Sequence, residues 1–428
     1  MSGRSEALLL LRRRTLIVLT VGQILGGLSL GAALSVGALA VNDLAGAAWS
    51  GLAATVTTLG AAVLAVPLAR LADRTGRRVS LSTAALIAGA GALISVVALS
   101  AASALVLFAG LGLTGAATAS ALQSRFAATD LASADSRGRD LSLVVWSTTI
   151  GAVTGPNLAE PGNALGAALG LAPLGGVFVF SLVAQLLAAV IYFVWMRPDP
   201  LLESRRLPIE IPTNATPVPA GAGDMRLVRV AIITVALSHA TMIALMSMTP
   251  VHLVHGGATL SVVGFTLSLH VAGMFALSPV FGVLADRLGR MPTIVGGQLL
   301  LLASAVITGL GSHQTTTVMI GLILLGLGWS ASTVAGSALL NDAAPADRRV
   351  SVQGRSDLAM NLAGAVGGAV AGPMLAWLTY AGLSWSLALP IVFVLAVSLT
   401  TTRAGRSGSS RGPRGQASAA RSAATPPH

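Results

Sequence analysis

The sequence contains the same short charged motif twice, each time between two long apolar runs. Leu71-Ala72-Asp73-Arg74-Thr75-Gly76-Arg77 returns 213 positions later as Leu284-Ala285-Asp286-Arg287-Leu288-Gly289-Arg290. A second pair of segments repeats at nearly the same offset. Gly138-Arg139-Asp140-Leu141 matches Gly354-Arg355-Ser356-Asp357-Leu358, and the Gly-Pro steps at 155–156 and 372–373 lie 217 positions apart. The chain therefore consists of one structural unit written twice.

The composition indicates which solvent surrounds this unit. Hydrophobic residues make up 54% of the chain and charged residues 10%, with a mean hydropathy of +0.81. One aqueous core cannot hide so much apolar surface, so the chain belongs in a lipid bilayer. A helix needs about 20 apolar residues to cross the hydrocarbon layer.

The sequence predicts twelve such helices and hence an all-α integral membrane protein of two pseudo-symmetric six-helix bundles. The first bundle has spans at residues 15–41, 50–70, 79–99, 102–124, 141–160 and 174–196. The second has spans at 228–252, 261–284, 292–312, 315–340, 356–378 and 382–402. The third and fourth spans are divided only around residues 100–103. The Gly/Pro-rich stretch 156–175 has room for a short helix at the membrane surface.

Four segments follow from these spans. They are a bundle at 1–197, a linker at 198–227, a bundle at 228–402 and a tail at 403–428. The linker is rich in proline, alanine, glycine and threonine, which predicts an extended tether. The tail has almost nothing to bury and is predicted to be disordered. The chain contains no cysteine, which excludes disulfides and thiolate metal sites.

All 26 basic residues are arginines, and the twelve-span topology places every one on the same side of the membrane. Basic residues near span ends stay in the cytoplasm. We therefore expect a multi-pass protein of the cell membrane with both termini and the linker cytoplasmic. The net charge of +11 then reflects topology and contact with membrane lipids, and no nucleic acid partner is expected, because the arginines are spread over seven segments. The first apolar stretch is too long for a cleaved signal.

The repeated motif resembles the signature of the major facilitator superfamily of secondary transporters. That signature reads Gly-x-Leu-Ala-Asp-Arg-x-Gly-Arg-Arg/Lys between the second and third spans. This chain matches it from Leu71 to Arg78, with Ala69 in place of the first glycine. The second copy keeps that glycine as Gly282 but has Met291 at the last basic position. The resemblance covers both motif copies and the six-plus-six layout, and it implies the fold of that superfamily.

The resemblance also implies a gate at the cytoplasmic helix ends. Asp73 would face the start of helix 11 and Asp286 the start of helix 5, while Ala69 and Gly282 would allow close helix approach. Alternatively, the motif fixes only topology and turn geometry, with Gly76 and Gly289 terminating helices. The expected gate residues are Asp73, Arg74, Gly76, Arg77, Asp286, Arg287, Gly289 and Arg290, with Arg125, Asp130, Arg139, Asp140, Asp342, Arg355 and Asp357 as partners.

Helix 5 carries a second element, Gly151-x-x-x-Gly155-Pro156, which resembles one in the drug and metabolite exporters of this superfamily. Helix 11 repeats the spacing at Gly368, Gly372 and Pro373. Small residues permit close helix packing and proline bends a helix. The symmetric copy also has a purely structural explanation. The arginine that such exporters carry in helix 4 is missing, since Leu111 and Thr114 occupy the corresponding element.

No carboxylate lies in the middle of a predicted span, so proton coupling would depend on histidine. His239 and His270 are the candidates, because ionisable groups inside a bilayer are costly and usually functional. A neutral packing role is the alternative for each. His252, His255 and His313 fall in outer loops. His252 and His255 have helical spacing but no third ligand, so no metal and no other cofactor is expected.

In the superfamily the substrate cavity is lined mainly by helices 1, 4, 7 and 10. The resemblance therefore points to a set of polar, methionine and tryptophan side chains, which suit a pliable pocket. Ordinary helix packing is an equal alternative for each member. The set is Gln23, Ser29, Thr114, Thr118, Ser238, His239, Met242, Met246, Trp329 and Ser332.

These observations predict a permease that acts as a monomer and moves a small organic molecule by alternating access, with proton-coupled efflux as the mode. Nutrient uptake or facilitated diffusion is the first alternative, and a membrane sensor or assembly protein that no longer transports is the second. An enzyme is not expected, because the spans offer no convergent catalytic groups. A lysine-free chain also lacks the phosphate-binding loop of ATPases.

Overall fold

The structure is a computed structural model that describes residues 3–132, 137–206, 224–345 and 349–409. Every regular element in these ranges is helical. The first half contains α1 (Gly3–Ala45), η1 (Ala47–Trp49), α2 (Leu52–Thr75), α3 (Arg77–Ser100), α4 (Ala104–Ala127), α5 (Arg137–Thr154), η2 (Gly155–Leu158), α6 (Ala159–Ala168) and α7 (Gly175–Trp195). A short helix, α8 (Pro200–Ser204), follows. The second half contains α9 (Met225–His255), α10 (Leu260–Phe275), α11 (Ser278–Arg287), α12 (Arg290–Leu310), α13 (Thr315–Ala343), α14 (Arg349–Ser386) and α15 (Ala388–Ser409).

The twelve predicted spans can be traced in the described residues. Ten segments are long and apolar enough to cross a membrane. The last, Val352–Thr401, holds two crossings, because the backbone leaves helical geometry at Thr379 (φ 62°, ψ 176°). The remaining crossing is made by α5, η2 and α6, which follow one another end to end. The predicted division around residues 100–103 is confirmed, since α3 ends at Ser100 and α4 begins at Ala104.

Proline accounts for two differences from the predicted boundaries. The fifth span leaves the α-helix after Thr154 and tightens into η2, where Pro156 has no backbone N–H to donate. The stretch that follows forms α6, the short helix that the sequence allowed. The eighth span was predicted as one helix but is broken between α10 and α11, and Pro279 lies in the first turn of α11.

The predicted linker and tail contain more helix than expected. Within the linker, Asp199 caps α8 by accepting hydrogen bonds from the backbone N–H groups of Leu201 and Leu202 at 3.0 and 3.2 Å. The last helix continues to Ser409, so the first residues of the predicted tail are helical. The rest of the tail and the middle of the linker lie outside the described residues.

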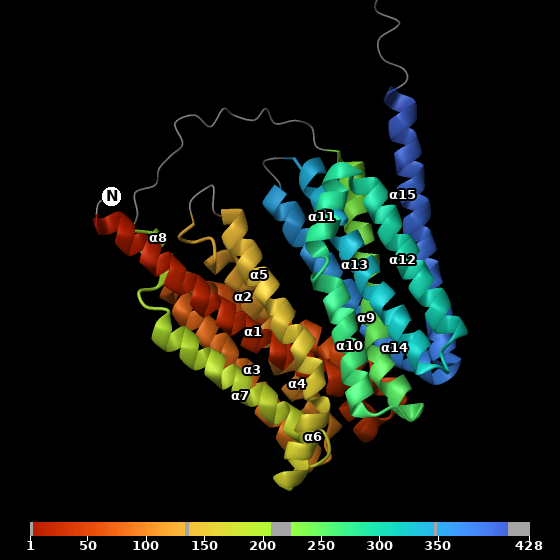
Figure 1. Cartoon of the computed structure of the whole chain (residues 1–428), viewed down its shortest axis with the longest axis horizontal. Coiled ribbons are helices and arrows are strands. Elements are labelled where there is room, and N and C mark those ends of the chain that lie inside the picture. The colour runs from red at the N-terminus through yellow and green to blue at the C-terminus, as the bar shows by residue number, and fades with distance from the viewer. Residues whose placement is uncertain (1–2, 133–136, 207–223, 346–348, 410–428) are drawn as a thin grey trace, which may run out of the picture.

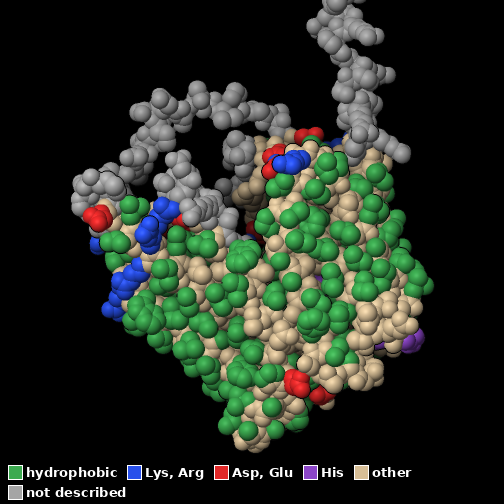
Figure 2. All heavy atoms as spheres, viewed as in Figure 1, with side chains coloured by type: hydrophobic (Ala, Val, Ile, Leu, Met, Phe, Trp, Pro, Cys, Tyr) green, Lys and Arg blue, Asp and Glu red, His purple; other side chains and the backbone are tan. Residues whose placement is uncertain are grey.

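The two halves stand side by side as separate helix bundles (Figure 1). They meet at one end and diverge toward the other. The diverging end carries the starts of α1 and α9 and the ends of α2, α4 and α11, which are the helix ends that bear arginine. We call it the arginine face. Figure 2 shows the flanks between the two faces covered mostly by hydrophobic side chains, as a surface in contact with lipid requires.

Glycine fixes the helix boundaries within both copies of the repeated motif. Gly76, between α2 and α3, has φ 94°, and Gly289, between α11 and α12, has φ 98°. Side chains other than glycine rarely adopt this conformation. The sequence-based expectation that both glycines end helices is therefore confirmed.

Close contact between α1 and α5 holds the first bundle together. A Cβ atom added at Gly151 would lie 1.9 Å from the carbonyl oxygen of Ile24, and one added at Gly27 would lie 2.6 Å from that of Thr148. Lipid provides no hydrophobic drive for helix association, so such close packing supplies much of the attraction. The packing role predicted for Gly151 and Gly155 agrees with these contacts.

We expect Gly27→Ala to lower the thermal unfolding midpoint by several degrees, because overpacking of this kind costs about 1–3 kcal/mol. Gly26→Ala is the matched control on the same helix, since a Cβ there has nothing within 4 Å. It should be neutral or slightly stabilising, because alanine favours the helix. Equal midpoints for the two variants, measured in detergent by intrinsic fluorescence, would contradict the close α1–α5 contact.

Candidate transport pathway

Hydrogen bonds of Thr55 and Ser268 join the bundles at the face opposite the arginines. Thr55 on α2 donates its hydroxyl hydrogen to the carbonyl oxygen of Ala365 on α14, at 2.8 Å. Ser268 on α10 donates to the carbonyl oxygen of Val153 on α5, at 2.6 Å, and accepts from the Asn157 side chain at 2.8 Å. We call these contacts between α2 and α14 and between α5 and α10 the outer seal.

Glycines one helical turn before these hydroxyls let the backbones approach. A Cβ added at Gly51 would lie 2.0 Å from the carbonyl oxygen of Gly368, and one added at Gly264 would lie 2.4 Å from that of Pro156. The packing residues predicted on helix 11 belong to this contact, since a Cβ at Gly372 would lie 2.4 Å from the carbonyl oxygen of Ala48. No larger residue fits at these positions without moving the helices apart.

The outer seal obeys the internal symmetry of the sequence. Gly51 and Gly264 are 213 positions apart, and so are Thr55 and Ser268. The sequence reasoning missed these residues, although extending the offset of the charged motif by one span would have found them. The two halves therefore contribute equivalent residues to one closure.

The same helices carry the charged motif at their other ends. Asp73 follows Thr55 by 18 residues along α2, and Asp286 follows Ser268 by 18 residues along α10 and α11. This length corresponds to about 27 Å of helix, close to the thickness of the hydrocarbon layer. The helices of the outer seal thus have polar groups near both membrane faces.

At the arginine face, the ion pairs in the described residues remain within one half. Asp73 accepts a hydrogen bond at 3.4 Å from Arg205, which follows α8, and Asp286 pairs with Arg290. Arg77 pairs with Asp130 at 2.9 Å, Arg12 with Asp140 at 2.6 Å, and Arg290 also with Asp342 at 3.0 Å. The prediction that Asp73 faces the start of helix 11 and Asp286 the start of helix 5 is not met in this conformation.

The reason is that the bundles have separated at this face. The carboxylates of Asp73 and Asp286 are 74% and 68% exposed. A Cβ added at Gly282 or Gly354 would meet nothing within 4 Å, so the close approach expected at Gly282 is also absent here. The bundles thus diverge toward the arginine face and meet at the outer seal (Figure 1).

The remaining predicted gate partners differ in position. Arg125 on α4 and Asp357 on α14 come from different halves and lie within electrostatic reach of each other, without a direct ion pair in the described structure. Arg74, Arg287 and Arg355 have exposed side chains. The side chain of Arg139 lies outside the described residues.

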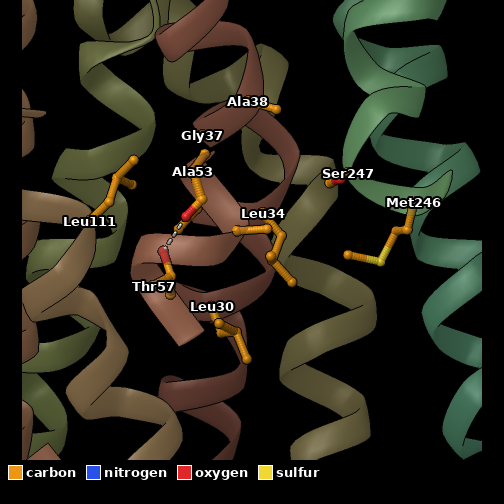
Figure 3. A pocket seen from close by; sticks show the side chains of 11 residues that line it. Leu30, Leu34, Gly37, Ala38, Ala53, Thr57, Leu111, Met246 and Ser247 are labelled. Atoms are coloured by element: carbon orange, nitrogen blue, oxygen red, sulfur yellow. Dashed lines mark hydrogen bonds between the residues drawn. The ribbon is translucent and has the colours of Figure 1, made fainter. Parts of the chain in front are cut away.

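Beneath the outer seal lies a small apolar cavity between the two bundles (Figure 3). Leu30, Leu34 and Leu111 line it from the first bundle, and Met246 and Ser247 reach it from α9 of the second. Its volume is about 20 Å³, room for roughly one water molecule. The closed end of the pathway is therefore packed by side chains that must part before a solute can cross.

A neutral polar cluster lies within the second bundle. The side-chain amide of Gln298 on α12 donates to the hydroxyl oxygens of Ser238 and Ser332 at 2.7 and 2.9 Å, and its own oxygen has no partner among the described residues. Ser238 and Ser332 were predicted for the cavity, and the structure brings them together. Gln298 was missed, although an amide in the apolar span 292–312 was a signal for it.

His239 and Trp329 form a second polar contact between α9 and α13. The indole N–H of Trp329 donates to Nδ1 of His239 at 3.1 Å. Indole nitrogen only donates, so Nδ1 accepts and the neutral ring carries its hydrogen on Nε2. Phe275 of α10 packs edge-on against Trp329, with ring centroids 5.9 Å apart. His239 is partly exposed and Trp329 is 9% exposed.

His270 has a different environment. Its Nδ1 lies 2.8 Å from the carbonyl oxygen of Leu322, which only accepts, so Nδ1 carries a hydrogen. The side chain is fully buried between α10 and α13. This geometry ties two helices together, and of the two histidines predicted for proton coupling only His239 is partly exposed.

Several other residues predicted for the cavity bond within their own bundle. Gln23 donates to the carbonyl oxygen of Ala121 at 3.3 Å, and Thr114 donates to that of Leu111 at 2.7 Å. Ser29 and Met242 are buried. Thr118 is partly exposed, and Met246 lines the cavity of Figure 3. The structure thus gathers the polar part of the predicted set in the second bundle and uses the first mainly for packing.

A two-bundle helical protein with one open and one sealed face has the architecture of a membrane transporter, not of an enzyme. The comparisons agree: the family model Major Facilitator Superfamily matches residues 16–257 and 231–426. The MFS-type transporters YdeG and YddS of Bacillus subtilis are 37% and 35% identical, covering 87% and 90% of this chain and 88% and 90% of theirs. The chain belongs to the Major Facilitator Superfamily.

More distant relatives share the fold. The riboflavin transporter RfnT of Brucella anthropi is 29% identical, covering 90% of this chain and 95% of that protein. A bacterial homologue of the human lysosomal transporter Spinster, in an inward-facing and occupied conformation, superposes with a TM-score of 0.70 at 17% identity, covering 92% and 97% of the two chains. The human organic anion transporter MFSD10 gives 0.60 at 16% identity, with 90% and 99% covered.

We expect Thr55→Val to loosen the outer seal by removing one of its two hydroxyl bonds. A cysteine placed at Met246 should then react about fivefold faster with a membrane-impermeant maleimide applied from the face opposite the arginines, because one such bond is worth about 1 kcal/mol. Thr75→Val on the same helix is the control, since Thr75 donates to Leu71 within α2 and does not line the cavity. Equal rates in both variants would show that the Thr55 bond does not hold the seal.

Proposed function

We propose that the chain is a proton-coupled exporter of the cell membrane that carries a small, uncharged, planar aromatic molecule. The observation that carries this proposal is that the same helices have polar residues for closure near both membrane faces. Thr55 and Ser268 close one face, while Asp73 and Asp286 lie free of the opposite bundle at the other. Such an arrangement supports alternating access by rocking of two bundles around a central site.

The orientation in the membrane follows from charge. The arginine-bearing helix ends would face the cytoplasm, with both termini, because basic residues resist translocation. The conformation described above is then open to the cytoplasm. In the outward-open state Asp73 would approach the start of helix 11, with Asp286 approaching the start of helix 5, while Thr55 and Ser268 release their carbonyl partners.

The second bundle supports the substrate class. Trp329 and Phe275 offer aromatic faces, and the amide of Gln298 with two serine hydroxyls offers neutral hydrogen-bonding groups. No charged side chain lines the cavity of Figure 3, which favours an uncharged solute, because an unpaired charge there would be costly. The relative named for riboflavin, an uncharged fused-ring compound with hydroxyl groups, is consistent with this class.

Proton coupling is assigned to His239 through its bond with Trp329. Protonation turns Nδ1 from an acceptor into a donor, so it cannot coexist with donation from the indole N–H. A proton on His239 would therefore free Trp329 and change the wall of the pathway. The helix 5 glycine–proline element supports export. The absence of a carboxylate from the cavity and the polar cluster favours facilitated diffusion or uptake as the second candidate.

The transport test uses inverted membrane vesicles with riboflavin and a panel of planar aromatic dyes. An acid interior should drive uptake by the wild type, which corresponds to export from cells. We expect His239→Gln to abolish this gradient-driven accumulation while substrate exchange without a gradient persists. His313→Gln, which changes a histidine of the outer loop, should behave as the wild type.

Three outcomes separate the possibilities. Accumulation by His239→Gln at the wild-type level would remove the proposed proton site. Exchange that no pH gradient enhances in the wild type would favour the facilitator. Failure of the wild type to move any panel compound in either assay would contradict the proposed substrate class.

A further inference from the structure

An apolar groove with two arginines at one end runs along the outer surface of the first bundle. It lies between α1 and α7 and is lined by Arg13, Arg14, Ile17, Val21, Ile191 and Trp195, among others. Its volume is about 520 Å³, within the range of roughly 300–1,000 Å³ typical of small-molecule sites. Ile17 is 65% exposed and Trp195 is 50% exposed, so the groove opens away from the bundle core. The pathway described above does not use it.

The three consecutive arginines at the start of α1 have different environments. Arg12 turns toward the bundle and holds Asp140 with two hydrogen bonds of 2.6 and 2.8 Å. Arg13 and Arg14 have exposed side chains, and neither has an ion-pair or hydrogen-bond partner among the residues that the structure describes. The groove thus offers two uncompensated positive charges next to lipid-facing apolar side chains.

The sequence places a charged residue and two apolar residues of the groove wall on one face of α1. Arg13, Ile17 and Val21 are spaced by four residues, so they lie one above the other on the same face of α1. The eight residue steps from Arg13 to Val21 extend about 12 Å into the membrane. Trp195, near the end of α7, has the side-chain type that prefers the level of the lipid headgroups. In Figure 2 arginine side chains gather beside hydrophobic ones on this flank.

We propose that this groove is a binding site for one anionic diacyl phospholipid of the membrane leaflet at the arginine face. The headgroup phosphate lies between the Arg13 and Arg14 guanidinium groups, and an acyl chain follows Ile17, Val21 and Ile191. Guanidinium groups suit phosphate, and the apolar wall demands a chain that a soluble phosphate lacks. The site depends on the membrane fold and not on the direction of transport.

The test is native mass spectrometry of the purified full-length protein, titrated with dioleoyl phosphatidylglycerol or dioleoyl phosphatidylcholine. The wild type should retain one molecule of the anionic lipid in preference to the zwitterionic one. Arg13→Gln with Arg14→Gln should weaken that retention roughly 30-fold, because each arginine near an anionic surface contributes about fivefold. Arg226→Gln with Arg229→Gln is the matched control. It removes two exposed arginines from the start of α9, the helix equivalent to α1, and should leave retention unchanged.

A second variant tests the apolar wall and keeps both charges. Val21→Trp should fill the groove and weaken phosphatidylglycerol retention, and it decides the question if the arginine double variant does not elute as a monodisperse protein. Equal loss in the two arginine double variants, or no loss in either Arg13/Arg14 or Val21→Trp, would overturn the site. Competition by glycerol phosphate at the concentrations at which the lipid binds would also overturn it, because the occupant would then be a free phosphate.

Discussion

The contact of α2 with α14 and of α5 with α10 at the arginine-free face determines the arrangement of the rest of the molecule. It consists of glycine-mediated backbone approach and two hydroxyl–carbonyl hydrogen bonds, those of Thr55 and Ser268. Each bond contributes only about 1 kcal/mol in a membrane protein. A seal of this strength can be exchanged for a comparable closure at the opposite face, and reversible exchange is what a carrier requires.

The outer seal is symmetric between the two halves of the chain, whereas the polar site is not. The sealing residues occur in both halves at one offset, so neither bundle controls the closure alone. The polar groups do not occur in both halves. The positions 213 residues before His239, Gln298 and Trp329 hold Gly26, Ala85 and Ala116. At these three positions the first bundle has small packing residues, while the second has hydrogen-bonding and aromatic groups. In the proposed mechanism, duplication provides the frame that rocks, and divergence of the second copy provides the polar site.

The sequence alone predicted most of the architecture, because span length, charge placement and the repeat are properties of composition and order. The helical division around residues 100–103 and the helix ends at Gly76 and Gly289 are examples. The sequence analysis did not predict the break between α10 and α11, which depends on a single proline, Pro279. It also missed Thr55, Ser268 and Gln298. A hydroxyl or an amide changes the mean polarity of an apolar span very little, so only the packed structure reveals its partner.

The gate shows a different limit of sequence reasoning. In the proposed mechanism one set of residues serves two conformations, and the expected contacts of Asp73 and Asp286 would form only in the conformation opposite to the one described. Arg205 holds Asp73 in this state, a role that the linker was not expected to have. A sequence pattern can identify the charged motif, but the free-energy difference between two conformations depends on the whole interface between the bundles.

The most direct test of the rocking account measures both faces of one protein by electron–electron double resonance. Because the chain has no cysteine, spin labels can be placed at will. One pair would join Thr75 and Leu358 at the arginine face, and the other Glu160 and His255 at the opposite face, all of them exposed. The distances would be measured at acidic and neutral pH, each with and without riboflavin. In every condition that lengthens the Glu160–His255 distance, the Thr75–Leu358 distance should shorten. Two distances that stay fixed, or that change in the same direction, would contradict the exchange of one seal for the other.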